Sequence, residues 1–249
     1  MRSAAALSLA IQLTCSAICS GQIKMRLQDI SVKGSPLHVS GAMLFEDDAS
    51  KAVRYSYQVE GSIANMSGRG VVLVVIHFAS SGVNGPSLDY TYQNDDFFSS
   101  DILQPGKDER FHSSPLRFGA PTVNGHPVPD DLDARSAPVA TAQAMFVQFI
   151  DGSTWGDADL GREPLVVRNQ TLTELRRLQR VLAQEGEQAL KNELSKSENL
   201  LPCISAVMDI CSDKAASCLA AGLRSMIEAA RQHQIDMKAK SALFGDVVR

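Results

Sequence analysis

The sequence predicts an α+β protein with an antiparallel, immunoglobulin-like β-sandwich over residues 22–168 and a helical region over residues 169–249. Two observations support this division. Up to about residue 167, apolar residues alternate with polar ones or form short β-branched runs between turn-forming segments. From residue 171 onward, apolar residues recur every three or four positions, which is the pattern of a half-buried helix.

The composition excludes several classes of protein. With 44% hydrophobic residues, 17 Gly and 10 Pro, the chain is neither collagen-like nor disordered throughout. The formal net charge of −4 supplies no surface that would neutralise phosphates, so we expect no nucleic-acid partner. Five Cys in 249 residues are too few for a scaffold held together by disulfides.

Residues 1–21 have the features of a secretory signal peptide. Arg2 is the positively charged residue of the n-region, an apolar run covers residues 4–14, and small residues continue to Gly21. The run is too short to span a bilayer, and no later segment is long and apolar enough to do so. Cys15 and Cys19 do not follow small residues, which disfavours lipid attachment. We expect export to the periplasm or the extracellular space; the alternative is a buried N-terminal helix.

The clearest strands flank a short turn. Residues 53–63 alternate between apolar and polar, and residues 65–70 are turn-forming. Residues 71–78 form a β-branched run with no polar face before His77, which predicts a strand covered on both sides. The pair is interpreted as a hairpin. Weaker strands are expected at four further segments: residues 23–27, 39–45, 88–92 and 145–150.

Helical signals begin with residues 171–174 (Thr-Leu-Thr-Glu), which match a capping box. An apolar stripe follows, made by Leu175, Leu178, Val181, Leu182, Leu190 and Leu194. Pro202 interrupts the pattern and precedes a short helix over residues 203–211. A third helix is expected over residues 213–241, with six residues directed inward: Ala216, Leu219, Leu223, Met226, Ile227 and Ala230.

No catalytic, cofactor or metal site is evident in the sequence. The nucleophile elbow, the phosphate-binding loop and the dinucleotide fingerprint are all missing. No two of the five His have the spacing of a zinc pair on a helix. A calcium loop beginning at Asp157 fails, because Gly161 and Arg168 occupy positions five and twelve. We therefore predict a chain that is not an enzyme and that needs no cofactor.

Three cysteines follow the predicted signal: Cys203, Cys211 and Cys218. In an exported chain a disulfide is favoured. Cys203 and Cys211 on one helix would lie about 12 Å apart, and a disulfide needs Cα atoms within about 7 Å. A turn near Ser212 would allow either Cys203–Cys218 or Cys211–Cys218. Three buried free thiols are the remaining alternative.

A few aromatic residues are candidates for a binding surface. Tyr90 and Tyr92 lie close to a Gly-containing loop, and Trp155 is the single Trp. If exposed on loops, they would mark a contact surface; otherwise Trp155 would pack over one end of the sandwich. Asn65 and Asn169 begin glycosylation sequons, which matter only in a host that glycosylates.

Part of the chain resembles a known family. Residues 59–68 (Val-Glu-Gly-Ser-Ile-Ala-Asn-Met-Ser-Gly), the apolar run 71–78 and residues 103–106 (Leu-Gln-Pro-Gly) are similar to bacterial secreted FxLYD-type β-sandwich domains. The resemblance covers roughly residues 53–106. It implies an immunoglobulin-like fold and no shared catalytic residues.

These observations favour an exported, non-catalytic interaction or structural module of the cell envelope. Its partner would be another envelope protein, or a second copy bound through the amphipathic helical region. The alternative is a secreted hydrolase with a site assembled in space. In that case His77 or His112 would contact both a carboxylate and a serine.

Overall fold

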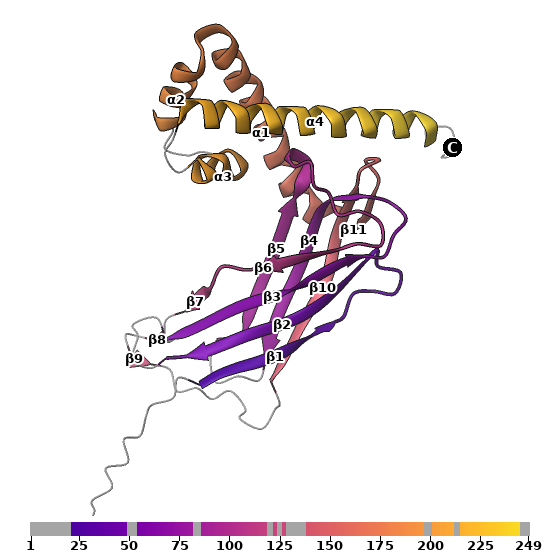
Figure 1. Cartoon of the computed structure of the whole chain (residues 1–249). Helices are drawn as coiled ribbons and strands as arrows, with labels where there is room; N and C mark the ends of the chain where they lie inside the picture. The colour runs from indigo at the N-terminus through magenta and orange to yellow at the C-terminus, as the bar shows by residue number, and fades with distance from the viewer. Residues whose placement is uncertain are drawn as a thin grey trace, which may run out of the picture.

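The computed structural model of the protein describes residues 21–48, 54–81, 86–118, 122–123, 126–127, 138–196, 201–211 and 215–244. It has the predicted α+β class, with a large curled sheet and a C-terminal group of helices (Figure 1). The helices gather at one end of the sheet, and the long helix α4 crosses above that end (Figure 1). Except for Gly21, which begins the first strand, the predicted signal peptide lies outside the described residues.

Nine strands of the described chain form the sheet, in the order β5-β4-β10-β1-β2-β3-β6, with β11 beside β10 and β7 beside β3. Two short strands, β8 and β9, pair separately. The strands are β1 (Gly21–Asp29), β2 (Leu37–Asp47), β3 (Tyr55–Asn65), β4 (Val71–Ser81), β5 (Leu88–Asp95), β6 (Asp108–His112), β7 (Leu116–Phe118), β8 (Thr122–Val123), β9 (His126–Pro127), β10 (Val139–Phe149) and β11 (Thr154–Gly156).

Strand β1 joins the two halves of the sheet. Most of it pairs antiparallel with β2, and its end pairs parallel with β10, where Leu27 lies opposite Ala140. The sheet is therefore mixed, and the expectation of a wholly antiparallel sheet is wrong at this pair. Strand β1 therefore makes the two halves one continuous sheet, and this sheet curls around its core.

The two halves of the curled sheet pack against one another through apolar side chains. The ring of Phe111 on β6 lies 5.4 Å from Phe78 on β4 and 5.5 Å from Tyr92 on β5. The hydroxyl of Tyr57 on β3 donates to the carbonyl of Pro86, 2.7 Å away, just before β5. Strands β5 and β6 lie at opposite edges of the hydrogen-bonded order, so side chains join them across the core.

The predicted hairpin of β3 and β4 is wrong. Strand β3 pairs with β2, β6 and β7, whereas β4 pairs with β5 and β10. Residues 66–70 carry the chain from one half of the sheet to the other. The burial prediction for β4 is confirmed, because residues 71–76 are all buried. Leu73 and Val75 form a separate apolar cluster with Phe146 on β10, and Leu165 of the first helix packs on it.

Two glycines allow a close approach of β2 and β3. Gly41 and Gly61 lie opposite one another, and Gly41 has a φ of 147°. A Cβ on Gly41 would lie 2.2 Å from the Glu60 carbonyl oxygen, and one on Gly61 would lie 2.1 Å from the Ser40 oxygen. The Phe111 ring covers Gly61 from the next strand. Glycine bends of this kind let a sheet curve sharply.

The helical region begins earlier than predicted. Helix α1 (Ala158–Glu185) starts at the Asp157 N-cap, whose side chain accepts from the amide of Asp159. The expected boundary at residues 168–169 therefore lies inside α1. The capping box at Thr171 is wrong, since its hydroxyl donates to the Val167 carbonyl within the helix. Gly161 and Pro164 lower the helix propensity of the first turns, which conceals them in the sequence.

The predicted apolar stripe is divided between two helices. Gly186, with a φ of 84°, ends α1, and the chain turns into α2 (Glu187–Lys196). Helices α3 (Pro202–Ile210) and α4 (Ala216–Phe244) lie within a few residues of the predicted ranges. The four helices enclose a second core, made by Leu175, Leu178, Leu190, Leu194, Ile204, Cys211, Leu219, Ala220, Leu223 and Met226.

The first helix packs on the sheet through Gly161. A Cβ there would lie 2.4 Å from the buried ring of Phe146. Gly161→Ala should gain about 1 kcal/mol of helix propensity and lose about 3 kcal/mol by overpacking. We expect the free energy of unfolding in urea to fall by about 2 kcal/mol. Gly68→Ala, whose Cβ meets no atom within 4 Å, should change it by less than about 0.5 kcal/mol. Equal effects at both positions would contradict this packing.

Candidate functional site

A buried arginine joins the helices to the sheet. Arg168 on α1 is 5% exposed. Its Nε and Nη2 donate to the two carboxylate oxygens of Asp95 on β5, at 2.9 and 2.7 Å. Its Nη1 donates to Gln148 on β10 at 2.5 Å, and the guanidinium lies 4.4 Å from the ring centre of Phe97. The buried guanidinium is thus stabilised by a bidentate carboxylate, an amide oxygen and the face of an aromatic ring.

A short 3₁₀ helix, η1 (Asp96–Phe98), makes the second connection. Phe97 is buried, and its carbonyl oxygen accepts a hydrogen bond from Nδ1 of His233 on α4 at 2.8 Å. The rings of Phe97 and His233 lie 5.6 Å apart. Phe98 packs against the helical core. Asp95, Phe97 and Phe98 at this end of the sheet are therefore held by α1, α4 and the helical core.

A polar cluster lies where the edge strands β5 and β6 approach one another. Nδ2 of Asn94 donates to Asp96 at 3.1 Å and to Glu109 at 3.4 Å. Burial, and next the charge of Glu109, raise the pKa of Asp96 to about 7. Burial also raises the pKa of Glu109. Burial and the charges of Glu109 and Asp96 raise the pKa of Tyr92 to about 12.

The three candidate aromatics lie in strands. Tyr90 and Tyr92 belong to β5, and Trp155 belongs to β11, opposite Val147. All three are half-buried and pack against the sheet core. Tyr90 stacks on Phe78, with ring centres 6.4 Å apart. These contacts make all three rings part of the core packing. Of the loop close to Tyr90, residues 80–86, positions 82–85 lie outside the described chain.

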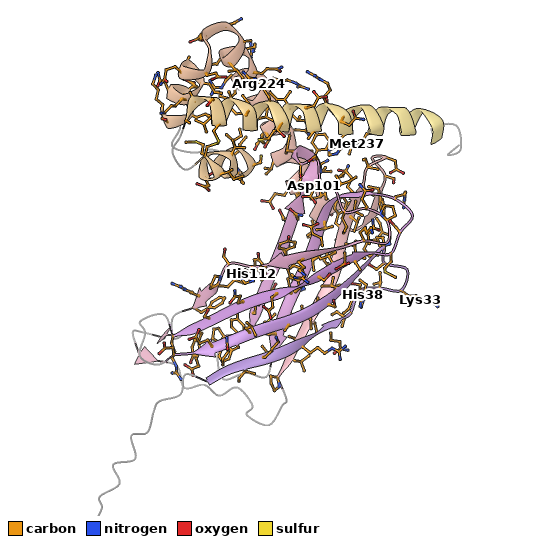
Figure 2. All side chains as sticks on the ribbon, in the orientation of Figure 1. Lys33, His38, Asp101, His112, Arg224 and Met237 are labelled. Atoms are coloured by element: carbon orange, nitrogen blue, oxygen red, sulfur yellow. A yellow bond between two sulfur atoms is a disulfide. The ribbon has the colours of Figure 1, made fainter. Side chains whose placement is uncertain are left out.

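The described histidines are dispersed. Nε2 of His77 lies 2.7 Å from Asp89, and Nε2 of His112 lies 2.6 Å from the Gln58 amide nitrogen. Figure 2 shows His112 at the left of the sheet and His38 at the right. Within the described part of the chain, the hydrogen bonds of His77 and His112 include no serine.

One of the two disulfide pairings left open by the sequence is present. Cys211 and Cys218 are bonded, with Cα atoms 5.9 Å apart, and they link the end of α3 to the start of α4. Cys203 is a half-buried free thiol, 3.5 Å from the hydroxyl of Thr171. Burial raises the pKa of this thiol.

The two turn motifs of the family resemblance contact one another. Asn65 is fully buried, and its Nδ2 donates to the carbonyl oxygens of Arg69 and Leu103 at 2.7 and 3.0 Å. Its Oδ1 accepts from the amide and hydroxyl of Ser67. The backbone amide of Gly106 donates to its carbonyl. Asn65 therefore holds two turns together, and the folded chain offers no access to a glycan at this sequon.

The outward face of β1, β2, β3 and β6 is hollowed near the glycine pair. A solvent-open depression of about 590 Å³ is lined by Lys24, Ser40, Gly41, Ala42, Glu60, Gly61, Ser62, Arg110, Phe111 and His112. Lys24 and Glu60 form an exposed ion pair of 3.2 Å across it. A second depression of about 370 Å³ on the same face is lined by Glu46, Asp48, Arg54, Ser56, Gln58, Pro115 and Arg117. We call this surface the outer face.

The sequence did not indicate the Arg168 network or the carboxyl pair. Arg168 lies one turn after Leu165 and one turn before Leu172 on α1, but the sequence pattern predicts a helix only from residue 171. Asp96 and Glu109 come together only through strand order. A comparison with protein families, curated proteins and solved structures found no match.

Arg168→Met should destabilise the chain, because it removes the cation from the Asp95 carboxylate at a largely buried junction. Removing one partner of a buried pair costs about 3–5 kcal/mol, and we expect the lower end because Asp95 keeps some exposure. Urea unfolding measures this change. Arg162→Met removes an exposed pair on the same helix and should cost less than about 1 kcal/mol. A loss at Arg168 no larger than at Arg162 would contradict the role of the junction.

The disulfide predicts a defined pattern of alkylation. In residues 22–249 unfolded by denaturant without reductant, iodoacetamide should add once, at Cys203. After reduction it should add three times. Intact-mass spectrometry with peptide mapping distinguishes these states. Addition at Cys211 before reduction would show that the pairing is wrong.

Proposed function

We propose that the chain is an exported, non-catalytic interaction module that binds a protein of the cell envelope through its outer face. The observation that carries this proposal is the pair of adjoining depressions on that face. Most of the residues that line them are polar or charged, and the larger depression is wide open to solvent. Small-molecule sites are usually enclosed and mostly apolar. A shallow polar surface suits a macromolecular partner, since non-obligate protein interfaces are about as polar as the remaining surface.

Charges of both signs line the outer face, with four cations (Lys24, Arg54, Arg110 and Arg117) and three anions (Glu46, Asp48 and Glu60). This slight cationic excess favours a partner with acidic groups. Arg110 is exposed on β6 and lies beside His112 in the larger depression. Arg117 is exposed in the smaller depression. Lys24 also lines the larger depression, and its ion pair with Glu60 is solvent-exposed and therefore weak enough to exchange.

The helical region supports self-association less well. Its apolar stripe is already buried within the chain, as Leu175, Leu178, Leu190 and Leu194 are all core residues. Phe98 of the sheet end completes this core. A second copy would have to displace these contacts to use the same stripe.

Two further observations support parts of this proposal. The Cys211–Cys218 disulfide is compatible with an oxidising compartment outside the cytoplasm. The facing halves of the sheet and the Asn65 turn are compatible with an immunoglobulin-like relationship. Of the described helices, none combines the length and apolar character needed to cross a membrane.

The alternative, a secreted hydrolase, has less support. A site based on His77 or His112 would need a nucleophile hydrogen-bonded to one of them. The contacts of these two residues described above go to the Asp89 carboxylate and the Gln58 amide.

The interaction proposal can be tested with a photocrosslinking amino acid. We would place p-benzoylphenylalanine at Ser62 on the outer face, and at exposed Thr91 on the outward side of β5 as control. In cells that naturally encode the chain, Ser62 should give a discrete crosslinked species that Thr91 does not give. Arg110→Glu should lower its yield about tenfold, because each 1.4 kcal/mol of binding is a factor of ten. Identical products at both positions, or a yield unchanged by Arg110→Glu, would contradict the proposal.

A further inference from the structure

The contact between the edge strands β5 and β6 contains two carboxyl groups that share one neutral donor. Asn94 extends from β5 and donates to both Asp96 and Glu109, the latter on β6. We call these three residues the acid seam. No ladder hydrogen bonds link β5 to β6, so this cluster and the Tyr92–Phe111 contact are the described links at this edge.

The charges around Asp96 are acidic. Those that act on it are Glu109 from β6, Asp95 from β5 and Asp101 from the loop after η1. Arg168 of α1 is bound to Asp95 through both carboxylate oxygens. From α4, His233 donates to the backbone of Phe97. An amide between two carboxylates cancels the charge of neither, so two ionised groups here would repel across a partly buried contact.

Along the chain, the acid seam directly precedes the residue to which the helices attach. Asp96 is the first residue of η1, and its carbonyl accepts from the Ser99 amide at 2.9 Å. The next residue, Phe97, lies beneath Arg168 and accepts from His233. A displacement of Asp96 away from Glu109 therefore moves the segment that α1 and α4 hold.

We propose that the acid seam is a proton-dependent contact that holds β6 against β5 and keeps η1 in place beneath α4. With one proton bound, the two carboxyls carry a single negative charge and the edge stays closed. When that proton is lost, repulsion separates β6 from β5 and loosens the helices from the sheet. This regulation concerns the junction rather than the outer face, so it does not depend on the proposed function.

The pH range follows from the raised pKa of Asp96. A carboxyl whose pKa is about 7 when folded and about 4 when released stabilises the closed form fully below pH 4. That contribution declines as pH rises, and it is lost above pH 7. Between pH 6 and pH 8 the closed state releases its proton, and the equilibrium for opening should rise about tenfold.

Hydrogen exchange followed by NMR on the oxidised full chain tests this proposal. The protection factors of the Ser99 amide and the β6 amides should fall about tenfold between pH 6 and pH 8. Those in the centre of β10 should stay constant. Asp96→Asn removes the titrating group and should abolish the change. Glu109→Gln removes the repulsion but leaves Asp96 buried, so it should reduce the change. Asp108→Asn, an exposed neighbour on β6, should behave as the natural chain.

Three results would overturn the proposal. The first is a natural chain with no pH dependence at Ser99 or β6. The second is an equal dependence after Glu109→Gln, which decides the question even if Asp96→Asn fails to fold. The third is a response of β6 without Ser99, which would show that the seam opens without affecting the helices.

Discussion

The structure depends on the burial of one guanidinium. Arg168 is surrounded by β5, β10, η1 and its own helix, and its donors are directed at Asp95 and Gln148. A cation in such a place is tolerated only when its hydrogen-bonding groups find partners. Meeting that requirement fixes the direction in which α1 leaves the sheet. Helices α2 and α4 pack on α1, and α3 packs on α4, so the position of the helical group follows from this contact.

The helical region is consequently an integral part of the fold. Its core receives Phe98 from the sheet, and the sheet cluster of Leu73, Val75 and Phe146 receives Leu165 from α1. Each part covers apolar surface that the other would expose to water. Cys211–Cys218 then restrains the entry into α4, the helix that reaches back to η1 through His233.

Local patterns in the sequence predicted local structure well. The unbroken apolar run of β4 correctly indicated a strand covered on both faces, and the spacing of Leu219, Leu223 and Met226 indicated the buried side of α4. Features that depend on partners were missed. Alternation identifies β3 as a strand but not its neighbours, so the hairpin with β4 was wrong. The start of α1 was concealed by Gly161, whose lack of a side chain is required by the ring of Phe146.

The candidate site was less predictable for the same reason. Asn94 and Asp96 are close in sequence, but Glu109 reaches them only because β6 adds to β3 and the sheet curls. The outer face likewise combines Lys24, Glu60 and Arg110 from three strands. The periodicity of one segment does not show which other strands its side chains will contact. The aromatic residues were conspicuous in the sequence, yet their half-buried rings serve the core.

The double pairing of β1 has a consequence for how the chain folds. Its last residues pair with the first part of β10, so Leu27 meets Ala140 across more than a hundred intervening residues. Contacts this distant in sequence are slow to form, because a long loop must close before any of their energy is gained. The sheet cannot close until β10 has been synthesised. An early, incomplete chain therefore leaves a β1 edge without its partner, and completion of the fold is tied to the arrival of β10.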